Sequence, residues 1–408
     1  MPDPVRLLYL IGQHPAINHG YLLAEIRYLR RLGFEVPVVS VSEPDRPLKE
    51  LTETEREEVT KTYYVKSLPV SRAIWAHVQE ALRRPWNYSR GLIFALQLTS
   101  GRPRRLAHHL AYFAEAVLVG RKMRQLGVSH LHASFSATVA LITTRIFPVT
   151  MSFAVYGFGE LHDPVATNLS ARIAGSLFVR SISRHGRGQL MLSCSRSEWS
   201  KLHYVPLGID PAKYSPRARD SNSSPIRLLC VGRLAPEKGQ IFLLQAIAEL
   251  LHSGIPVCLH LVGDGPDRAW LEREASALKV ADKVIFEGRV DQDGLMTLYA
   301  ETDIFVLTSL AEGIPMVLME AMAMEIPCIA PQITGIPELI ENGMDGMLFP
   351  VADVEHLVRV IRCLLESPDL RVKIGQRARA RVQRDYDMAL NTERFAALLQ
   401  QQLGRVGR

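Results

Sequence analysis

The chain has 408 residues, which is too many for one ordinary hydrophobic core and predicts two domains of roughly 200 residues each. Hydrophobic residues make up 47% of the sequence and charged residues 22%, a balance that excludes a disordered or fibrous protein. No stretch of about 18 residues is apolar without a charge, so a membrane-spanning helix is not expected. The first eleven residues lack the basic segment and long apolar run of a signal peptide, and they indicate the first strand of the fold.

The net charge of +6 is divided unevenly along the chain. Residues 1–205 hold 26 basic and 15 acidic side chains, whereas the remainder holds 22 and 27. The basic residues concentrate between Arg72 and Arg124, where Trp75, Trp86 and Tyr88 lie among apolar residues. Such a segment fits an anionic membrane surface, and it equally fits a pair of surface helices with solvated arginines. Nucleic acid is disfavoured as a partner, because none of the usual binding motifs is present.

Five cysteines are scattered along the sequence, at Cys194, Cys230, Cys258, Cys328 and Cys363. Their number is odd and no two form a Cys-x-x-Cys pair, which excludes a disulfide scaffold and a cysteine zinc site. The pattern predicts reduced, mostly buried thiols in a cytoplasmic protein.

The first half alternates short apolar runs with helical patterns. An apolar run at 5–11 ends at Gly12 and a polar loop, a helical pattern covers 21–33, and a second apolar run covers 35–41. Strand, loop, helix and strand make a βαβ unit. The alternation continues with helices over 71–126 and 137–145 and with strands at 128–133, 149–156 and 190–194.

A segment rich in proline, serine and aspartate, residues 206–216 with 220–225, predicts a linker between the two halves. The alternation then restarts, with strands at 226–231, 257–262, 284–287, 304–307 and 328–330 and helices at 239–253, 266–278, 291–300 and 315–324. Each half therefore indicates a parallel, doubly wound sheet. Two such domains in series predict a cleft that faces the carboxyl ends of both sets of strands.

Residues 309–321 carry the most informative motif. A strand ends near Thr308, Gly313 permits a tight turn, and Pro315 suits the first position of a helix. Around the expected helix start lie the amides of Ile314, Met316 and Val317. A free helix N-terminus favours an anion, most naturally a phosphate.

Two glutamates flank that helix start, Glu312 just before it and Glu320 one or two turns inside it. Eight helical residues span about 12 Å, which is too far for a shared proton but suits the two ends of a nucleoside diphosphate. One carboxylate then binds hydroxyls on the sugar side, and the other binds those of the ribose. The alternative is a pair of ordinary glutamates at a helix end.

A second motif, residues 231–239, follows the first strand of the second half. Arg233 and Lys238 stand five residues apart on a loop between Gly232 and Gly239, and both can reach one pyrophosphate from there. The alternative is a pair of surface charges. No Gly-x-Gly-x-x-Gly occurs in this loop or at 263–266, which argues against a nicotinamide or flavin site.

Together these motifs resemble glycosyltransferase family 4, whose members are retaining enzymes with the two-domain GT-B fold. The resemblance is specific over 190–382 and rests on V-G-R-L-x-x-E-K-G at 231–239, L-V-G-D-G-P at 261–266, F-E-G-R-V at 286–290, E-G-I-P-M-V-L-M-E-A-M-A at 312–323, G-I-P-E-L-I at 335–340 and N-G-x-D-G at 342–346. Its finer pattern, with weaker matches at 131–135 and 152–157, looks like bacterial exopolysaccharide enzymes of the colanic-acid and amylovoran type.

The resemblance implies an α/β protein with the GT-B fold, two Rossmann-like, doubly wound domains that face each other across a cleft. We expect an acceptor-binding domain at 1–205, a nucleotide-sugar-binding domain at 206–383, and a helix at 384–408 that crosses back to the first domain.

By the same resemblance, the catalytic residues are Glu312, which contacts the transferred sugar, and Arg233 and Lys238, which hold the donor diphosphate. Glu320 holds the ribose. The expected donor-binding residues are Gly12, Gly232, Arg289 and Val290 beside the base, Gly313, Ile314, Met316, Val317 and Glu320.

One residue departs from the family pattern at a position near the expected reaction centre. Many members carry a histidine where this chain has Tyr156. Tyrosine can donate a hydrogen bond but cannot be a cation, so the change bears on sugar preference, rate and activity. His132 is a candidate for a nearby contact to donor sugar or acceptor, and the alternative for it is a structural histidine at a strand end.

The sequence therefore predicts a retaining glycosyltransferase that moves a sugar from a nucleotide-diphosphate sugar to a saccharide or lipid-linked acceptor in exopolysaccharide or cell-surface polysaccharide synthesis. No His/Cys cluster indicates an essential metal or cofactor, so basic side chains are expected to stabilise the leaving diphosphate. The expected location is the cytoplasm, with peripheral contact to the inner face of the cytoplasmic membrane.

Two alternatives from other classes stay open. One is a non-catalytic relative that binds a nucleotide sugar or glycan, and the other is a different GT-B enzyme such as a nucleotide-sugar epimerase. The sequence does not identify the sugar, the base, the acceptor or the oligomeric state.

Overall fold

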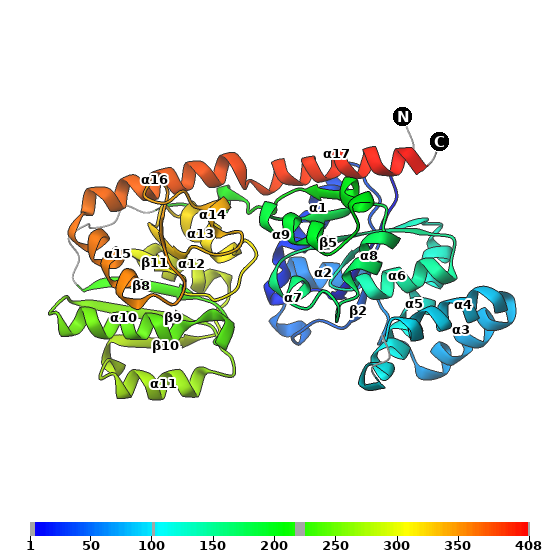
Figure 1. Ribbon diagram of the computed structural model, residues 1–408, viewed down its shortest axis with the longest axis horizontal. Coiled ribbons are helices and arrows are strands. Elements are labelled where there is room, and N and C mark those ends of the chain that lie inside the picture. The colour runs from blue at the N-terminus through cyan, green and yellow to red at the C-terminus, as the bar shows by residue number, and fades with distance from the viewer. Residues whose placement is uncertain (1–4, 100–102, 217–224, 407–408) are drawn as a thin grey trace. The chain divides into compact units, whose positions relative to one another are not determined.

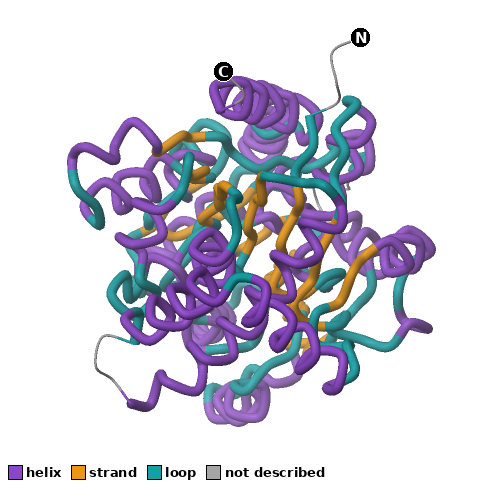
Figure 2. The backbone as a smooth tube through the Cα atoms, turned by 90° about the vertical axis from the view of Figure 1, so that its right-hand side faces the viewer, coloured by secondary structure: helices purple, strands orange, loops and turns teal. Residues whose placement is uncertain are grey.

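The computed structural model describes residues 5–99, 103–216 and 225–406 of the chain (Figure 1). It divides into two compact units. The N-terminal unit holds the residues up to 182, residues 186–205 and those from 392 on, and the C-terminal unit holds 183–185 and 206–391. Each unit is built on one parallel sheet, with the strands inside and helices around them (Figure 2).

The sheet of the N-terminal unit has seven strands in the order β3-β2-β1-β4-β5-β6-β7. The strands are β1 (Leu8–Gln13), β2 (Val38–Ser42), β3 (Thr62–Tyr64), β4 (His130–Ser134), β5 (Thr150–Val155), β6 (Val179–Ser181) and β7 (Leu202–Tyr204). The helices are α1 (Gly20–Arg31), α2 (Glu53–Lys61), α3 (Val70–Arg83), α4 (Pro85–Gln97), α5 (Leu106–Leu126), α6 (Ala137–Ile146), α7 (Phe158–Leu161), α8 (Leu169–Gly175) and α9 (Arg184–Leu192).

The sheet of the C-terminal unit has six strands in the order β10-β9-β8-β11-β12-β13. The strands are β8 (Ile226–Val231), β9 (Val257–Val262), β10 (Val284–Gly288), β11 (Ile304–Val306), β12 (Cys328–Pro331) and β13 (Met347–Phe349). The helices are α10 (Gln240–His252), α11 (Arg268–Ala277), α12 (Gln292–Glu301), α13 (Met316–Ala323), α14 (Ile336–Leu339), α15 (Val354–Glu366) and α16 (Pro368–Asp385), followed by α17 (Met388–Val406). The parallel, doubly wound sheet predicted for each half is confirmed.

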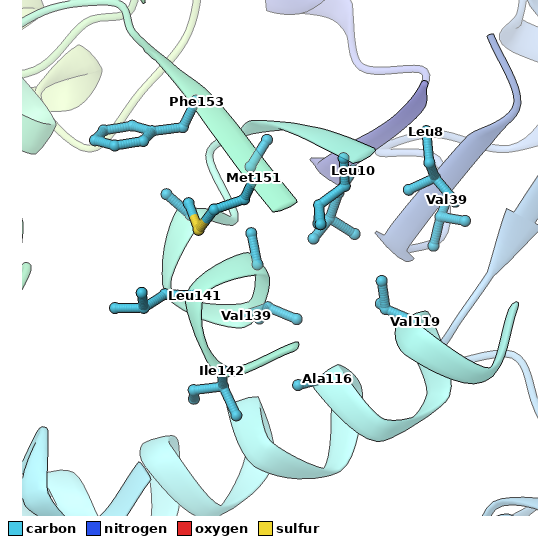
Figure 3. Close-up of a cluster of buried hydrophobic side chains, with 14 of the residues drawn as sticks. Leu8, Leu10, Val39, Ala116, Val119, Val139, Leu141, Ile142, Met151 and Phe153 are labelled. Atoms are coloured by element: carbon cyan, nitrogen blue, oxygen red, sulfur yellow. The ribbon is translucent and has the colours of Figure 1, made fainter. Parts of the chain in front are cut away.

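Strand β1 shows why the N-terminal sheet is covered on both faces. Successive side chains of a strand point to opposite faces, and here both alternating sets are apolar. Leu8 and Leu10 belong to a core with side chains of α5 and α6, among them Ala116 and Val139 (Figure 3).

Helices α1 and α17 cover the other face of this sheet. Tyr9 and Ile11 of β1 share a buried cluster with Phe395 and Leu399 of α17, and the long red helix runs along this unit in Figure 1. Arg180 of β6 is fully buried there, with its guanidinium 4.3 Å from the centre of the Phe395 ring. The same guanidinium lies 2.5 Å from the carboxylate of Glu25, so α17 covers a buried ion pair.

Three expectations from the sequence differ from the structure. Residues 190–194, predicted as a strand, are the end of α9 and the turn after it, so this prediction is wrong. A short apolar run fits a buried helix as well as a strand, and here the helix forms. Residues 206–216 of the predicted linker pack into the C-terminal unit, where Leu207 and Tyr214 are buried, whereas 217–224 lie outside the described residues. The final helix begins at Met388, because residues 384 and 385 still belong to α16.

The basic segment predicted as helical forms α3, α4 and α5, apart from residues 100–102, which include Arg102 and lie outside the described part of the chain. None of the helices described here combines the length and apolar character needed to span a bilayer.

Candidate functional site

The two donor motifs lie at the point where the strand order of the C-terminal sheet reverses. Strands β8 and β11 are parallel neighbours at its centre, with β9 and β10 on one side and β12 and β13 on the other. The loops that leave β8 and β11 diverge, which opens a crevice at their carboxyl ends. Residues 232–239 follow β8 and residues 307–315 follow β11, so both motifs border this crevice.

Glycines let these loops approach each other through their backbones. Gly263 has φ of +131°, and a Cβ placed on it would lie 2.0 Å from the carbonyl oxygen of Gly232. The Gly232 amide donates to Val262 and the Leu234 amide donates to Asp264. The L-V-G-D-G-P motif thus holds the Arg233 loop in place, because only glycine tolerates both this φ and this approach.

Lys238 and Glu312 form an ion pair between the loops that follow β8 and β11. The Lys238 ammonium lies 2.6 Å from a carboxylate oxygen of Glu312, and the Ser309 hydroxyl donates to the same oxygen at 2.7 Å. The Thr308 hydroxyl donates to the carbonyl of Lys238 at 3.2 Å, which ties the two loops together. The expected diphosphate lysine and the expected sugar glutamate therefore neutralise each other in the protein alone.

Arg233 is a further cation on the same loop as Lys238. Its side chain is exposed, and within the described residues its guanidinium has no ion-pair partner. Its backbone carbonyl accepts a hydrogen bond from the Gln240 side chain, which fixes the loop without engaging the charge. Arg289 is also exposed, with its Nε 4.0 Å from the Asp264 carboxylate, and Val290 beside it is partly buried.

The helix α13 starts one residue later than predicted. Pro315 has an extended backbone and caps the helix, so Met316, and not Pro315, is the first helical residue. The amides of Leu318 and Met319 donate to the Pro315 carbonyl, which leaves the amides of Met316 and Val317 at the free N-terminus. Ile314 is buried, and the carbonyl of Gly313 lies 2.5 Å from where a Cβ of Gly335 would be.

Glu320 is the fifth residue of α13, and tyrosines surround it. The Tyr299 hydroxyl donates to its carboxylate at 2.9 Å, and the Tyr214 hydroxyl makes a second hydrogen bond. Burial raises the pKa of the Glu320 carboxyl, and these two hydrogen bonds oppose that shift. Neither tyrosine was singled out from the sequence, because each is distant along the chain and belongs to no recognised motif.

The corresponding reversal in the N-terminal sheet lies between β1 and β4, and an aromatic stack stands there. The Phe135 ring follows β4 and stacks on His19 at 4.5 Å and on Tyr156 at 4.8 Å between ring centres. The Tyr21 ring lies 5.4 Å from Tyr156. A Cβ on Gly12 would lie 3.4 Å from the Cβ of Phe135, so Gly12 borders the same stack.

Tyr156 lies at the end of β5 and is anchored by its neighbours. Its hydroxyl is 2.9 Å from the Ser134 hydroxyl, and burial raises the pKa of Tyr156, so the phenol stays protonated. His132 is not brought to this surface. It is fully buried, its Nδ1 bonds Ser152, and its ring packs near Phe178. Burial lowers the pKa of His132 well below its ordinary value, as for a neutral core histidine.

Phe135 combines two properties of a functional residue that the sequence did not reveal. Its φ is +63°, a left-handed conformation that is rare for a bulky side chain and clusters at functional sites. It is also 40% exposed although it stands in an aromatic stack.

Glu160 adds a titratable group four residues after Tyr156. Its carboxylate accepts from the Tyr156 amide at 3.3 Å and lies 3.9 Å from the Arg172 guanidinium. Burial raises the pKa of Glu160 to about 7, and Arg172 only partly offsets that shift.

We expect this carboxyl to make the protein less stable as pH rises. Because the native protein binds the Glu160 proton more tightly than the unfolded chain, the free energy of unfolding falls between about pH 4.5 and pH 7, by about 3 kcal/mol. Glu160→Gln should remove that part of the pH dependence, measured by urea unfolding across this range. Glu50→Gln, at an exposed glutamate of the same unit, is the control, and equal slopes in wild type and Glu160→Gln would contradict the assignment.

The structure gives no sign of a built metal site among the residues that it describes. No group of three or more His, Cys, Asp or Glu side chains there is placed to hold an ion. The sequence contains Asp-x-Asp spacings at 291–293 and 385–387, but Asp291 caps α12 by accepting from Gly294, and Asp385 pairs with Arg384.

Comparison with known proteins gives consistent matches. The family profile described as "Glycosyl transferases group 1" matches residues 214–381. The putative colanic acid biosynthesis glycosyltransferase WcaL of Escherichia coli K12 is 24% identical over 425 residues, covering 97% of this chain and 100% of its own. Glycogen synthase of Mycobacterium tuberculosis is 32% identical over 305 residues, covering 69% of this chain and 72% of its own.

Among solved structures, Anabaena Alr3699/HepE in complex with UDP-glucose has a TM-score of 0.72 at 17% identity, covering 97% of this chain and 99% of its own. These matches and the two parallel sheets confirm the α/β GT-B fold, and relatives named for exopolysaccharide synthesis confirm the resemblance seen in the motifs. This chain therefore belongs to the glycosyl transferases group 1 family and is a glycosyltransferase.

Proposed function

We propose that this glycosyltransferase moves a sugar from a nucleotide-diphosphate sugar to a saccharide or lipid-linked acceptor in exopolysaccharide synthesis, with retention and without a metal. The observation that carries the proposal is the Lys238–Glu312 pair beside Arg233 and the free start of α13. The name of WcaL supports the substrate class, and the UDP-glucose in the HepE structure supports the kind of donor.

In this proposal the C-terminal unit stabilises the leaving group. Negative charge develops on the diphosphate as the sugar departs, and Arg233, Lys238 and the Met316 and Val317 amides are cationic or positively polarised groups suited to meet it. A diphosphate attracts Lys238 away from Glu312, which frees the Glu312 carboxylate to contact the sugar. Retention by attack on the front face of the sugar then requires no protein nucleophile.

Glu320 suits the ribose in the same proposal. A carboxylate can accept hydrogen bonds from two vicinal hydroxyls. The Glu320 carboxylate would accept those of the ribose in addition to those that it accepts from Tyr299 and Tyr214. Arg289 and Val290 follow β10 on the same side of the crevice as the Arg233 loop, the position assigned to the base.

A screen of nucleotide sugars for thermal stabilisation tests the donor assignment, since a ligand at 100 times its Kd stabilises by about 2.7 kcal/mol. The donor found there is then incubated with candidate acceptors, and the product is examined by NMR for its anomeric configuration, with and without EDTA. Inversion, or loss of activity in EDTA, would contradict the mechanism. Donor binding without release of nucleoside diphosphate in the presence of any acceptor would instead identify a non-catalytic relative, the alternative that the tyrosine at 156 raised.

Phe135 should contribute more to acceptor use than to stability. Phe135→Gly relieves a left-handed backbone, a gain of about 1 kcal/mol that offsets the loss of ring stacking. The unfolding free energy should therefore change by less than about 1.5 kcal/mol, while transfer falls more than tenfold because a flat apolar surface is lost. Lys279→Gly, at an exposed residue with φ of +60°, is the matched control and should leave transfer unchanged. A Phe135→Gly enzyme with full activity would contradict the role.

We also propose peripheral membrane contact through α3, α4 and α5. Trp86 is 87% exposed, Trp75 and Leu82 are exposed as well, and Arg83 lies next to them in sequence. Arginines near an anionic surface contribute roughly 1 kcal/mol each, and tryptophans favour the headgroup region.

Flotation with vesicles tests this contact. Wild type should float with vesicles that contain an anionic lipid and should be released by salt. Arg83→Gln combined with Arg84→Gln removes about 2 kcal/mol of attraction, which lowers the affinity more than tenfold. Lys373→Gln combined with Arg377→Gln removes two exposed charges from α16 and is the control. Equal recovery of both double variants would refute the contact.

A further inference from the structure

A groove in the N-terminal unit, which we call the α3–α5 groove, has no role in the donor or aromatic sites. It has a volume of about 730 Å³, within the range of roughly 300–1,000 Å³ typical of ligand pockets. Its walls come mainly from three helices, including Ala73, Ile74 and Val78 of α3, Leu92 of α4, and Leu110 and Ala111 of α5.

The few polar groups in its wall are already engaged with one another. The Tyr88 hydroxyl lies 3.0 Å from His77 Nδ1, and His77 Nε2 lies 3.3 Å from the Ala114 carbonyl. The Lys66 ammonium lies 3.5 Å from the Glu115 carboxylate. Burial also lowers the pKa of His77, which keeps its ring uncharged. The groove therefore favours an apolar ligand, because most of its wall is apolar and its polar side chains already have partners.

The lip of the groove continues as exposed apolar surface. Ile74, Val78 and Leu110 line the groove and are each at least 40% exposed, and Val70 at the start of α3 is more exposed still. Contiguous apolar surface of this kind marks a membrane, protein or ligand contact.

The surrounding charge decides among these partners. Between Val65 and Leu118, the segment that lines the groove, the sequence has Lys66 and seven arginines, one of them (Arg102) outside the described residues, against two acidic residues, Glu80 and the Glu115 paired with Lys66. Glu80 is fully buried and lies 2.9 Å from the Arg124 guanidinium, so it adds no negative charge to the surface. A second copy of the chain would set like charges against each other, whereas anionic phospholipids match this face in both charge and apolar character.

We propose that the α3–α5 groove takes up one hydrocarbon chain of an anionic phospholipid, whose headgroup phosphate is attracted by the excess of arginines in this segment of the chain. This proposal rests on the membrane contact proposed above and makes it more specific. The surface would not only touch a bilayer but also hold a single lipid chain.

Filling the groove tests the proposal without altering charge. Ala111→Trp places a ring in the groove, and Ala107→Trp places the same ring one turn earlier on α5, at an exposed residue outside it. The first probe is dansylundecanoic acid, free in solution and without vesicles. We expect saturable fluorescence enhancement with wild type and Ala107→Trp and an affinity at least tenfold weaker with Ala111→Trp, while thermal melting shows all three folded. Equal binding by the two variants would overturn the proposal.

The second probe is a vesicle of phosphatidylcholine and phosphatidylglycerol that carries a phosphatidylglycerol with a photoactivatable diazirine in its acyl chain. Labelling of α3 and α5 peptides in wild type and Ala107→Trp, and its loss in Ala111→Trp while flotation persists, would support the groove. Equal labelling of wild type and Ala111→Trp would show surface contact alone and would overturn it. Probe binding in solution without flotation would refute the membrane contact and leave the groove standing, so the two proposals fail separately.

Discussion

Arg233→Ala is expected to lower kcat/KM for the donor more than tenfold and to leave the stability of the C-terminal unit unchanged. The side chain is exposed and has no ion-pair partner among the described residues, so folding gains little from its charge. A diphosphate in the crevice is partly desolvated, and a charge-assisted hydrogen bond to it contributes about 1.5–3 kcal/mol. The loss should therefore appear in donor affinity and rate together, measured by steady-state kinetics.

Lys238→Ala should show the same kinetic loss with a small additional cost to stability. The variant leaves the Glu312 carboxylate with only the Ser309 hydroxyl, and a partly exposed ion pair contributes about 1 kcal/mol or less. The controls are Arg227→Ala and Lys283→Ala, which break ion pairs near the amino ends of β8 and β10 in the same sheet. Unchanged kinetics in both crevice variants, or equal losses in the controls, would refute the diphosphate assignment.

The second large effect separates the two glutamates. Glu312→Gln keeps one acceptor but removes the charge that would stabilise a cationic sugar in the transition state, so kcat should fall strongly. Because Glu312 neutralises Lys238 in the free protein, removing its charge also releases Lys238. The affinity for a bare nucleoside diphosphate should therefore stay the same or increase, as measured by calorimetric titration.

Glu320→Gln should behave in the opposite way. It removes a contact made equally in the ground and transition states, so it should mainly raise KM and weaken the bare nucleotide. Stability should stay equal or increase, because burial disfavours the charged carboxylate and glutamine can still accept from Tyr299. Weaker nucleotide binding with intact kcat in Glu312→Gln would show that the roles are wrong, and early melting of both variants would favour ordinary helix-end glutamates.

Much of the fold could be predicted from the sequence because its central strands are continuous apolar runs bounded by glycine or polar loops. β8 and β9 have the predicted bounds, and α10 and α13 differ from theirs by one residue at each end. The three-residue strands β3, β6, β7 and β13 were missed, because so short a run is stabilised by its neighbours in the sheet and not by its own pattern.

The candidate site was less predictable, since its geometry depends on strand order. Lys238 and Glu312 are 74 residues apart, and only the adjacency of β8 and β11 brings them to 2.6 Å. Nothing in the sequence around Phe135 indicates its left-handed backbone conformation. His132 is the opposite case. A polar residue near a strand end suggests a functional site, but in the structure helix α17 packs over His132 and keeps it buried.

The position of α17 has a consequence for how the protein is made. Synthesis runs from the N-terminus to the C-terminus, so β1 and α1 leave the ribosome well before α17, and this face of the N-terminal unit stays incomplete until α17 follows. Until then Tyr9, Ile11 and the Arg180–Glu25 pair lack the cover of Phe395 and Leu399, whose burial contributes about 1.5–3 kcal/mol each. A truncation before Phe395 would therefore remove side chains from the core of the unit that is translated first.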